Sequence, residues 1–472
     1  MNAVRVVAPS LEDPFVAKMS PVVGGPCGRR VRPGRHGWWT ATRVLVVLAV
    51  LVLALGVVEK QHCRAHGWTS PDQFFHGCYS DLPIVYQTSG LARGAIPYGP
   101  DAVPAQQLDQ PVVTGTALWL VAKLVPGGDV RAQTRWYFDL STIVVAGLLV
   151  ALVAITVASA GRRRPFDAAL VALSPLVALS ALVSLDLLGV TLAAGGLLAW
   201  GRRRPVLAGV LLGLATMART YPALLVLVLG LLAMRAGRIR VWAVTAVAGA
   251  ATCLLVLAPW WLVGASGVGS AYRDWAKAAA GYGSPWLLPQ TLFATPRPGW
   301  MSRLGLHSVT LAPGTVTTLT VLGVAVALAL GAALTLGPAR RPRVAQVAFV
   351  VLAVVVLTGK AWPVQASLWL LPLAALAHPR WRDHLVWVSA EATYFMAVWL
   401  YAAAAAAPDR ALPATWYSVF LIARVGGLLW LVWCVVREIR DPARDVVRRD
   451  GSDDPLGGPL EHAGDALVVR AG

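Results

Sequence analysis

Four charged residues stand next to apolar segments, where a charge is costly unless it is paired or used. Two are carboxylates, Asp81 in CYSDLPIVY and Asp186 in LVSLDLLGV, and two are cations, Arg219 in MARTYP and Lys360 in TGKAWPVQ. A carboxylate can take the proton of an attacking hydroxyl group. Arg or Lys can stabilise the charge of a departing phosphate. The four residues therefore indicate a reaction in which a hydroxyl group displaces a phosphate ester.

The chain is too apolar to be a soluble protein. Hydrophobic residues make up 57% of its 472 residues and charged residues only 14%, whereas a soluble domain carries about a quarter charged residues. The apolar residues fall in long blocks, such as 44–58 and 137–160. Such blocks are expected to be transmembrane helices, because a helix satisfies every backbone polar group inside lipid. The sequence therefore predicts an all-α polytopic membrane protein.

The net charge of +18 reflects short arginine runs between the apolar blocks. These runs lie at 162–164, 202–204, 235–240 and 340–343. Such clusters are typical of the cytoplasmic loops of membrane proteins. No basic stretch is interleaved with stacking aromatic residues, so we expect no binding to nucleic acid.

The arginine runs also set the predicted topology. We expect residues 1–43 to be a disordered cytoplasmic arm, so the first helix, near 44–58, leads outward and the loop 59–136 is external. The apolar segment 112–125 is then re-entrant or interfacial. A full crossing there would place the arginines of 162–164 outside, against the charge rule.

Twelve transmembrane helices complete this topology within a membrane domain of residues 44–436, with both termini in the cytoplasm. Several helices have only about 15 residues, fewer than the roughly 20 that a bilayer needs. Their turns are therefore expected to lie within the membrane depth and to line a cavity. A second external loop covers 265–315, and 437–472 is expected to be a disordered cytoplasmic tail. The helices are predicted near 44–58, 137–160, 166–183, 185–200, 205–219, 220–234, 241–264, 316–337, 344–358, 364–378, 384–404 and 416–436.

This topology brings the polar residues to one level near the outer surface. Asp81 lies in the first external loop, Asp186 and Arg219 at two outer turns, and Lys360 at a third. Each also has a structural explanation, because either carboxylate could cap a helix and either cation could extend to lipid phosphates. The external loops contain no Asp-x-Asp pair, and no Gly-rich phosphate loop is present. The set suits a phosphate-bearing lipid used on the external face and calls for no cofactor.

Cysteines and histidines of the first loop raise two further possibilities. Cys63 and Cys78 could form a disulfide if the loop is external, and the sequence leaves this open. His62, His66 and His76 could suggest zinc, but their spacing fits no standard zinc module. We therefore predict no metal site.

Three stretches of the sequence resemble glycosyltransferase family 87. The first is CYSDLPIVYQTSGLARGAIPY followed by DQPVVTGTALWL, the second runs from SPLVALSALVSLDLLGV to MARTYPALLVL, and the third is GKAWPVQASLWLLPLAAL. They occur in the family's order, and the resemblance runs from about residue 78 to 400. It implies a GT-C fold and an actinobacterial α-mannosyltransferase of the cell membrane. Such an enzyme uses polyprenyl-phosphate mannose and a lipid or glycolipid acceptor on the external face.

The resemblance also implies roles for the candidate residues. Asp81 matches the catalytic acid of the first external loop and would take the acceptor proton, so that transfer inverts the anomeric centre. Arg219 and Lys360 would bind the donor phosphate. The expected substrate pocket contains Tyr86, Asp186, Tyr221, His307, Trp362 and Gln365.

Two departures from the family pattern leave the sugar and the acceptor open. Asp109-Gln110-Pro111 stands where the family commonly has Glu-Tyr-Pro, and Gly359 stands where it has a polar Asn. Transfer of arabinofuranose or glucose from the same kind of lipid is the nearest alternative. A lipid or glycan transporter is the alternative of another class. Its polar residues would follow the whole transport path, whereas those found here gather at the outer end.

Overall fold

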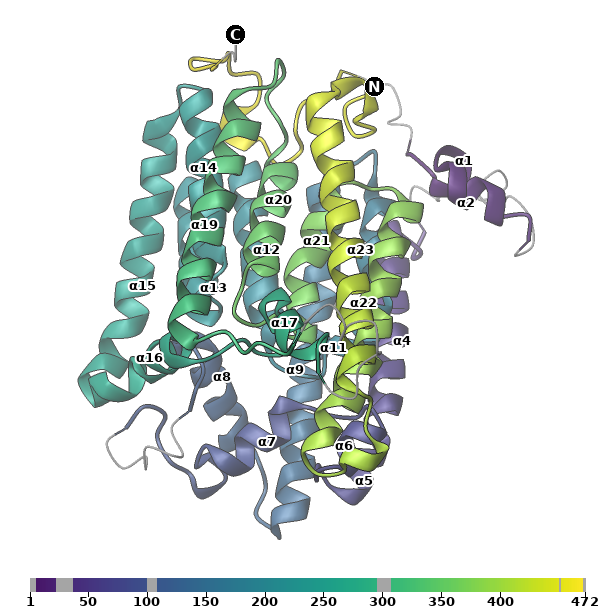
Figure 1. Ribbon diagram of the computed structural model, residues 1–472. Coiled ribbons are helices and arrows are strands. Elements are labelled where there is room, and N and C mark those ends of the chain that lie inside the picture. Colours follow the sequence, from purple (N-terminus) through teal and green to yellow (C-terminus); the bar gives the residue numbers. More distant parts are fainter. Residues whose placement is uncertain (1–5, 23–36, 100–107, 295–306, 450, 470–472) are drawn as a thin grey trace.

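The computed structural model describes residues 6–22, 37–99, 108–294, 307–449 and 451–469. Within these ranges the chain forms helices and no strand. The long helices stand side by side in one bundle, and most of the segments that connect them gather at its two ends (Figure 1). The all-α fold that the sequence predicts is confirmed.

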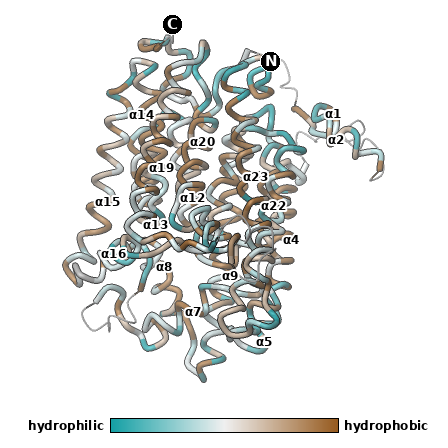
Figure 2. Tube along the Cα trace, viewed as in Figure 1, coloured by the Kyte–Doolittle hydropathy of each residue, from teal (hydrophilic) through white to brown (hydrophobic). Residues whose placement is uncertain are grey.

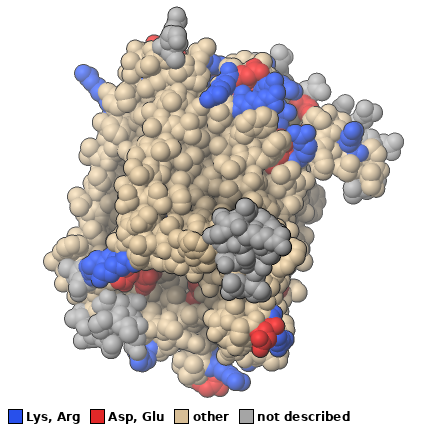
Figure 3. Space-filling model, in the orientation of Figure 1, with Lys and Arg blue, Asp and Glu red and all other residues tan. Residues whose placement is uncertain are grey.

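Six helices of the described residues are long and apolar enough to span a membrane, and the chain is a multi-pass membrane protein. Figure 2 shows hydrophobic residues along most of their length. Figure 3 shows a broad band without charged side chains between the two charged ends of this face. The six are α4 (Ala41–Glu59), α9 (Val130–Ala160), α15 (Ile239–Val268, with non-helical backbone at Gly264), α19 (Pro313–Leu336), α22 (Trp381–Ala402) and α23 (Ala414–Arg440).

Five shorter apolar helices stand among these long ones, as the sequence predicts. The longest of them has 16 residues, which is about 24 Å at 1.5 Å per residue. A hydrocarbon core is about 30 Å thick, so each of these helices alone is shorter than the core. The five are α12 (Asp186–Gly201), α13 (Pro205–Ala218), α14 (Pro222–Arg235), α20 (Val344–Leu357) and α21 (Ser367–Ala377).

One predicted helix, 166–183, is wrong. The structure has three short pieces instead: η3 (Pro165–Ala168), α10 (Ala169–Ala172) and α11 (Pro175–Ser180). Pro175 has no backbone N–H to continue the preceding helix. Ser174 therefore starts a new one, and its Oγ accepts a hydrogen bond from the backbone N–H of Leu176 (3.3 Å).

The two ends of the bundle differ in composition. We call the end that carries residues 161–164, 202–204, 235–238 and 340–343 the arginine end, and the opposite end the loop end (Figure 1). The loop end carries α5 (Gln61–His66), α6 (Asp72–Phe75), α7 (Asp81–Thr88), η1 (Leu91–Arg93), α8 (Val112–Lys123), α16 (Ser270–Lys277), η4 (Pro285–Leu287) and α17 (Leu288–Thr291). With 12 residues, α8 is too short to span, in keeping with the interfacial position expected for 112–125.

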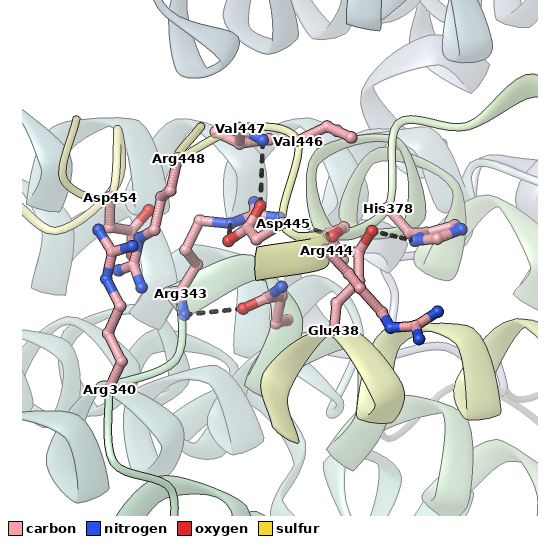
Figure 4. A network of polar contacts seen from close by, with 12 residues as sticks. Arg340, Arg343, His378, Glu438, Arg444, Asp445, Val446, Val447, Arg448 and Asp454 are labelled. Carbon is pink, nitrogen blue, oxygen red and sulfur yellow. Dashed lines mark hydrogen bonds and ion pairs between the residues drawn. The ribbon is translucent and has the colours of Figure 1, made fainter. Parts of the chain in front are cut away.

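The expected disorder of residues 437–472 is corrected by the structure. α23 continues to Arg440, and residues 441–449 and 451–469 pack against the arginine end. The Asp445 carboxylate lies 2.9 Å from Arg343 Nε, and the Asp465 carboxylate lies 2.6 Å from Arg235 Nη2. Figure 4 shows Asp445 beside Arg343 in this network. The acids of the tail offset the arginine runs, which would otherwise repel one another, and this pairing gives a polar segment a fixed position.

The described part of the predicted disordered arm, 1–43, also has structure. It contains α1 (Pro9–Glu12) and α2 (Pro14–Met19), and the Val7 N–H donates to the carbonyl of Arg163 (2.7 Å). Residues 1–5 and 23–36 of this arm lie outside the described residues.

Close helix packing places the short helices. α12 packs against α9 and α13, and α13 packs along α15. Gly209 and Gly213 make the second contact possible, because a Cβ atom at either would meet the backbone of Thr245 or Gly249. Small residues at four-residue spacing allow helices in membranes to approach in this way. This contact fixes the end of α13, where Arg219 lies.

Candidate active site

The start of α7 is held by Ser80 and not by Asp81. The Ser80 Oγ accepts a hydrogen bond from the N–H of Leu82 (3.3 Å) and donates one to the carbonyl of Leu182 (2.7 Å). The backbone N–H of Asp81 donates to the carbonyl of Val183 (2.7 Å). Since Ser80 is the N-cap, the Asp81 carboxylate is free for another role, and the start of α7 is fixed to the turn between α11 and α12.

Two side chains hold the Asp81 carboxylate. The Tyr79 hydroxyl donates to Oδ1 (2.7 Å), and the Gln365 amide approaches Oδ2 at 3.4 Å. The Tyr79 ring stacks on Trp399 with 4.5 Å between centroids. Gln365 belongs to η5 (Val364–Ala366), which precedes α21. The loop between α4 and α7 and the segment that precedes α21 thus meet at this carboxylate.

The environment of Asp81 suits a general base. The pKa of Asp81 is raised to about 6, mainly by burial and also by the charge of Asp186, against the lowering effect of the hydrogen bond from Tyr79. Part of the residue remains accessible. A carboxylate with a pKa near 6 is ionised at neutral pH and still basic enough to take a proton.

Asp186 and Arg219 form an ion pair between α12 and the end of α13. Arg219 donates to Asp186 Oδ1 from Nε (2.8 Å) and from Nη2. Ser184 donates to the same oxygen (2.7 Å), and Trp369 Nε1 donates to Oδ2 (2.6 Å). Asp186 is 1% exposed and makes no capping hydrogen bond. The capping explanation for Asp186 is therefore wrong, and its carboxylate fixes the guanidinium group.

One edge of the Arg219 guanidinium faces a neutral partner. Nη1 donates to the side-chain oxygen of Gln110 (2.8 Å), and 15% of the arginine side chain is exposed. The backbone carbonyl of Gln110 accepts a hydrogen bond from the Tyr98 hydroxyl (2.7 Å). An anion could replace the neutral Gln110 oxygen at this edge more easily than it could replace the Asp186 carboxylate.

Lys360 is fully engaged by backbone carbonyls. Its Nζ donates to the carbonyls of Trp275, Ala276 and Ala278 at 2.8–3.0 Å, and the residue is 3% exposed. These carbonyls end α16, where a cation is favourable. A lysine has three N–H donors. The expectation that Lys360 binds the donor phosphate is therefore corrected, because it closes the end of α16.

Comparison with known proteins decides the family. The model of glycosyltransferase family 87 matches residues 113–362, which is just over half of the chain. The chain belongs to glycosyltransferase family 87. The resemblance drawn from the sequence is thereby confirmed, and the chain is a membrane glycosyltransferase.

The other comparisons add little. No curated protein matches the family 87 chain. Among solved structures, it is similar to ArnT from Cupriavidus metallidurans bound to undecaprenyl phosphate, with 14% identity over 92% of this chain and 86% of that one and a TM-score of 0.44. The family match contains Asp186, Arg219 and Lys360 but stops short of Asp81 and Gln365.

The remaining predicted pocket residues of the family 87 chain differ in their positions. Tyr221 stacks on Trp369 (5.1 Å between centroids), next to the Asp186 ion pair. Tyr86 is 3% exposed and stacks on Tyr137 (4.4 Å), so it packs α7 against α9. Trp362 is fully buried, and His307 is exposed in the second long loop. The structure thus brings Gln365, Asp186 and Tyr221 to the site, and it does not bring Tyr86, Trp362 or His307 there.

Sequence reasoning missed several residues that hold this site of the family 87 chain. Tyr79 and Trp369 lie in stretches that carry the family resemblance. Their hydroxyl and indole N–H groups could have been recognised as hydrogen-bond donors to the two carboxylates. Gln110 is one of the departures from the family pattern, and it contacts Arg219 directly. Lys60 shows no sequence signal beyond its charge. It is fully buried, donates to the Gly77 carbonyl (3.2 Å), and its charge lowers the pKa of Asp81.

A buried arginine supports the segment that carries Gln365. Arg424 of α23 donates to the carbonyls of Trp362 (2.5 Å) and Pro363 (3.2 Å). Its Nε donates to Glu391 of α22 (2.9 Å). Because Arg424 and Glu391 are 0% and 2% exposed, the ion pair is rigidly enclosed. It fixes the backbone that places Gln365 beside Asp81.

Groups that could hold a metal ion lie away from Asp81. Within the described part of the chain, they are His62 with Asp72 and His76, and His378 with Asp383 and Cys434. A cavity of about 350 Å³ lies at the arginine end, lined by residues of α1, the loop 161–164 and the tail. It is at the end of the bundle opposite Asp81, so we do not take it as the site of sugar transfer.

Proposed function

We propose that this family 87 enzyme transfers mannose from polyprenyl-phosphate mannose to a hydroxyl group of a lipid or glycolipid. The loop end of the bundle, which carries Asp81, would face the outside of the cell membrane. Both termini and the arginine runs would lie in the cytoplasm. The observation that carries the proposal is the geometry at Asp81. Its carboxylate is free of any capping role, is oriented by Tyr79 and Gln365, and feels the charges of Asp186 and Arg219.

In this mechanism Asp81 is the general base. The contact between Oδ2 and Gln365 is long at 3.4 Å, so an acceptor hydroxyl could replace it. Tyr79 would keep Oδ1 in place during this exchange. As the hydroxyl oxygen attacks the anomeric carbon, its proton passes to Asp81. The bond from that carbon to the phosphate oxygen breaks, and the polyprenyl phosphate leaves. Attack from the face opposite the phosphate inverts the configuration, so a β-linked donor gives an α-mannoside.

Arg219 would stabilise the departing phosphate. Asp186 holds Nε and Nη2 of the guanidinium group, and the edge next to Gln110 remains for the phosphate. The growing negative charge is then met by a donor that needs no reorganisation during the reaction. Lys360 takes no part in this step, because its protons are used at the end of α16. No step in this mechanism calls for a metal ion.

The experiment that tests the proposal compares donors. Membranes that contain the protein are given polyprenyl phosphate carrying labelled mannose, glucose or arabinofuranose, and the glycolipid products are analysed by mass spectrometry and NMR. We expect transfer of mannose alone, with the α configuration. Transfer of glucose or arabinofuranose in place of mannose would overturn the sugar assignment. Movement of labelled lipid across sealed vesicles without any glycoside product would favour a transporter.

A further inference from the structure

Two short helices at the loop end carry a cluster of metal-ligating side chains that the proposed sugar transfer does not use. His62 and His66 lie four residues apart on α5, and Asp72 and His76 lie four residues apart on and just after α6. Residues at this spacing lie on one face of a helix. Two such pairs therefore face each other, although the spacing along the sequence fits no standard zinc module.

The ligand atoms are already close together. His62 Nε2 lies 2.7 Å from Asp72 Oδ2, and His76 Nδ1 lies 3.2 Å from Asp72 Oδ1. One ligand atom from each of the three residues lies within 4.8 Å of the other two. Around a tetrahedral zinc ion with bonds of about 2.0–2.1 Å, neighbouring ligand atoms are about 3.3 Å apart. The ligand atoms of the three side chains thus lie near the spacing that one shared ion requires.

A disulfide fixes the backbone beneath this cluster. Cys63, on α5, is joined to Cys78, two residues beyond His76, and both cysteines are fully buried. The side chains above this bridge are partly open to solvent, with exposed fractions of 32% for His62, 41% for Asp72 and 46% for His76. The backbone is therefore held in place, while the ligands can be reached and can turn.

Ring orientation sets the movement that binding needs. The His62 and His76 rings stack with centroids 3.5 Å apart and planes 13° apart, and His66 stacks on His62 at 4.6 Å. Nearly parallel rings direct their lone pairs side by side. One ring must turn before both can bind the same ion, and His76 is the most exposed of the three ligands.

We propose that His62, Asp72 and His76 form a binding site for a divalent transition-metal ion, with zinc as the expected occupant. Two imidazoles and a carboxylate are a donor set that suits zinc, and three protein ligands leave a fourth position for solvent. Bound metal would tie α5 to α6 beside the disulfide, a few residues before Asp81. The second cluster, around His378, makes a poorer metal site. Its imidazole lies between the carboxylates of Asp383 and Glu438 at 3.0 Å from each, as an ion-pair network.

The test is a metal titration of the purified full-length protein in detergent. The purification tag contains no histidine, and bound metal is first removed with a chelator. Zinc binding is measured by calorimetry, and cobalt serves as a spectroscopic probe that zinc displaces. The variants are Asp72→Asn, His76→Ala and the matched control His462→Ala. His462 is 78% exposed in the tail, far from α5 and α6 in the sequence.

We expect one zinc ion per protein in the wild type and in His462→Ala. In Asp72→Asn and His76→Ala the affinity should fall by more than about tenfold, as for loss of a group that holds a metal. Binding should also weaken as the pH falls through the range in which imidazoles take up protons. The proposal is overturned if the wild type binds no stoichiometric zinc, or if Asp72→Asn and His76→Ala bind it as tightly as the wild type. Asp72→Asn is isosteric at a partly exposed position, so its thermal unfolding should match that of the wild type and exclude misfolding.

Discussion

The hydrogen bond from Tyr79 to Asp81 gives the sharpest test of the proposed base. Tyr79→Phe removes the hydroxyl that lies 2.7 Å from Asp81 Oδ1 and leaves a ring that can still stack on Trp399 and Phe74. In the wild type, the hydrogen bond from Tyr79 favours the ionised carboxylate. Without this bond, the pKa of Asp81 should rise above the value of about 6. A hydrogen bond to a charged group is worth about 1.5–3 kcal/mol, and one pKa unit corresponds to about 1.4 kcal/mol. Partial replacement by water makes a rise of about one unit the expected result.

The assay is the pH dependence of kcat/KM for sugar transfer, which reports the free enzyme's ionisations. In the wild type, activity should fall as the pH drops through about 6, because protonated Asp81 cannot accept the acceptor proton. In Tyr79→Phe the same fall should occur near pH 7. At pH 6 the ionised fraction would drop from about one half to about one tenth, a loss of roughly fivefold, while at pH 8 the two proteins should differ little. An acid limb that stays in place in Tyr79→Phe, with lower activity at every pH, would refute the assignment of that limb to Asp81.

Three further predictions concern the groups around the site. Arg219→Gln should lower kcat/KM by about 10²-fold, as for loss of one transition-state donor, and Asp186→Asn should have a similar effect because it releases the guanidinium group that Asp186 holds. The double variant should lose little more, because the two residues act as one ion pair; fully additive losses would contradict a shared role. Lys360→Met should destabilise the protein by about 1–3 kcal/mol through the carbonyls left without a donor, seen as a lower Tm. Its KM for the donor should not change, and a large rise in that KM would restore Lys360 to the phosphate site. Replacing Cys63 and Cys78 together by Ser should lower the free energy of unfolding by about 3 kcal/mol, the value for closing a loop of about 15 residues. An unchanged Tm in non-reducing buffer would show that the bridge adds no stability.

Hydropathy and arginine runs predict most of the fold for a physical reason. Each apolar block must satisfy its own backbone in lipid, so the helices follow from local composition alone. The shortness of α12, α13, α14, α20 and α21 was also visible in the sequence. The segment 166–183 misled because hydropathy does not register that Ser174 and Pro175 restart the helix.

The tail and Lys360 show what local sequence cannot reveal. Residues 441–469 read as polar and disordered, but their acids meet arginines such as Arg235 and Arg343, more than 90 residues earlier in the chain. Lys360 lies in a motif that suggests phosphate binding, and its partners are three carbonyls of the second long loop, 82–85 residues away. Long-range pairings of this kind are set by how the helices pack.

The site itself was only partly predictable. Asp81, Asp186 and Arg219 stood out because charged residues at membrane depth are rare, and Gln365 followed from the family resemblance. The role of each residue could not be predicted from the sequence. Ser80 and Asp81 are both good helix caps, and only the hydrogen bonds show that Ser80 takes that role and leaves the Asp81 carboxylate free.

The measurement that tests the central claim most directly is the rate of mannose transfer by Asp81→Asn, with Asp409→Asn as the matched control. Asp409 is exposed in the connection between α22 and α23, and the chemical change is the same. Both variants should appear in membranes at the wild-type level with similar Tm values. We predict that Asp409→Asn keeps wild-type activity and that Asp81→Asn loses about 10²–10⁴-fold, the contribution of a general base. Mannose transfer at an undiminished rate by Asp81→Asn would contradict the account.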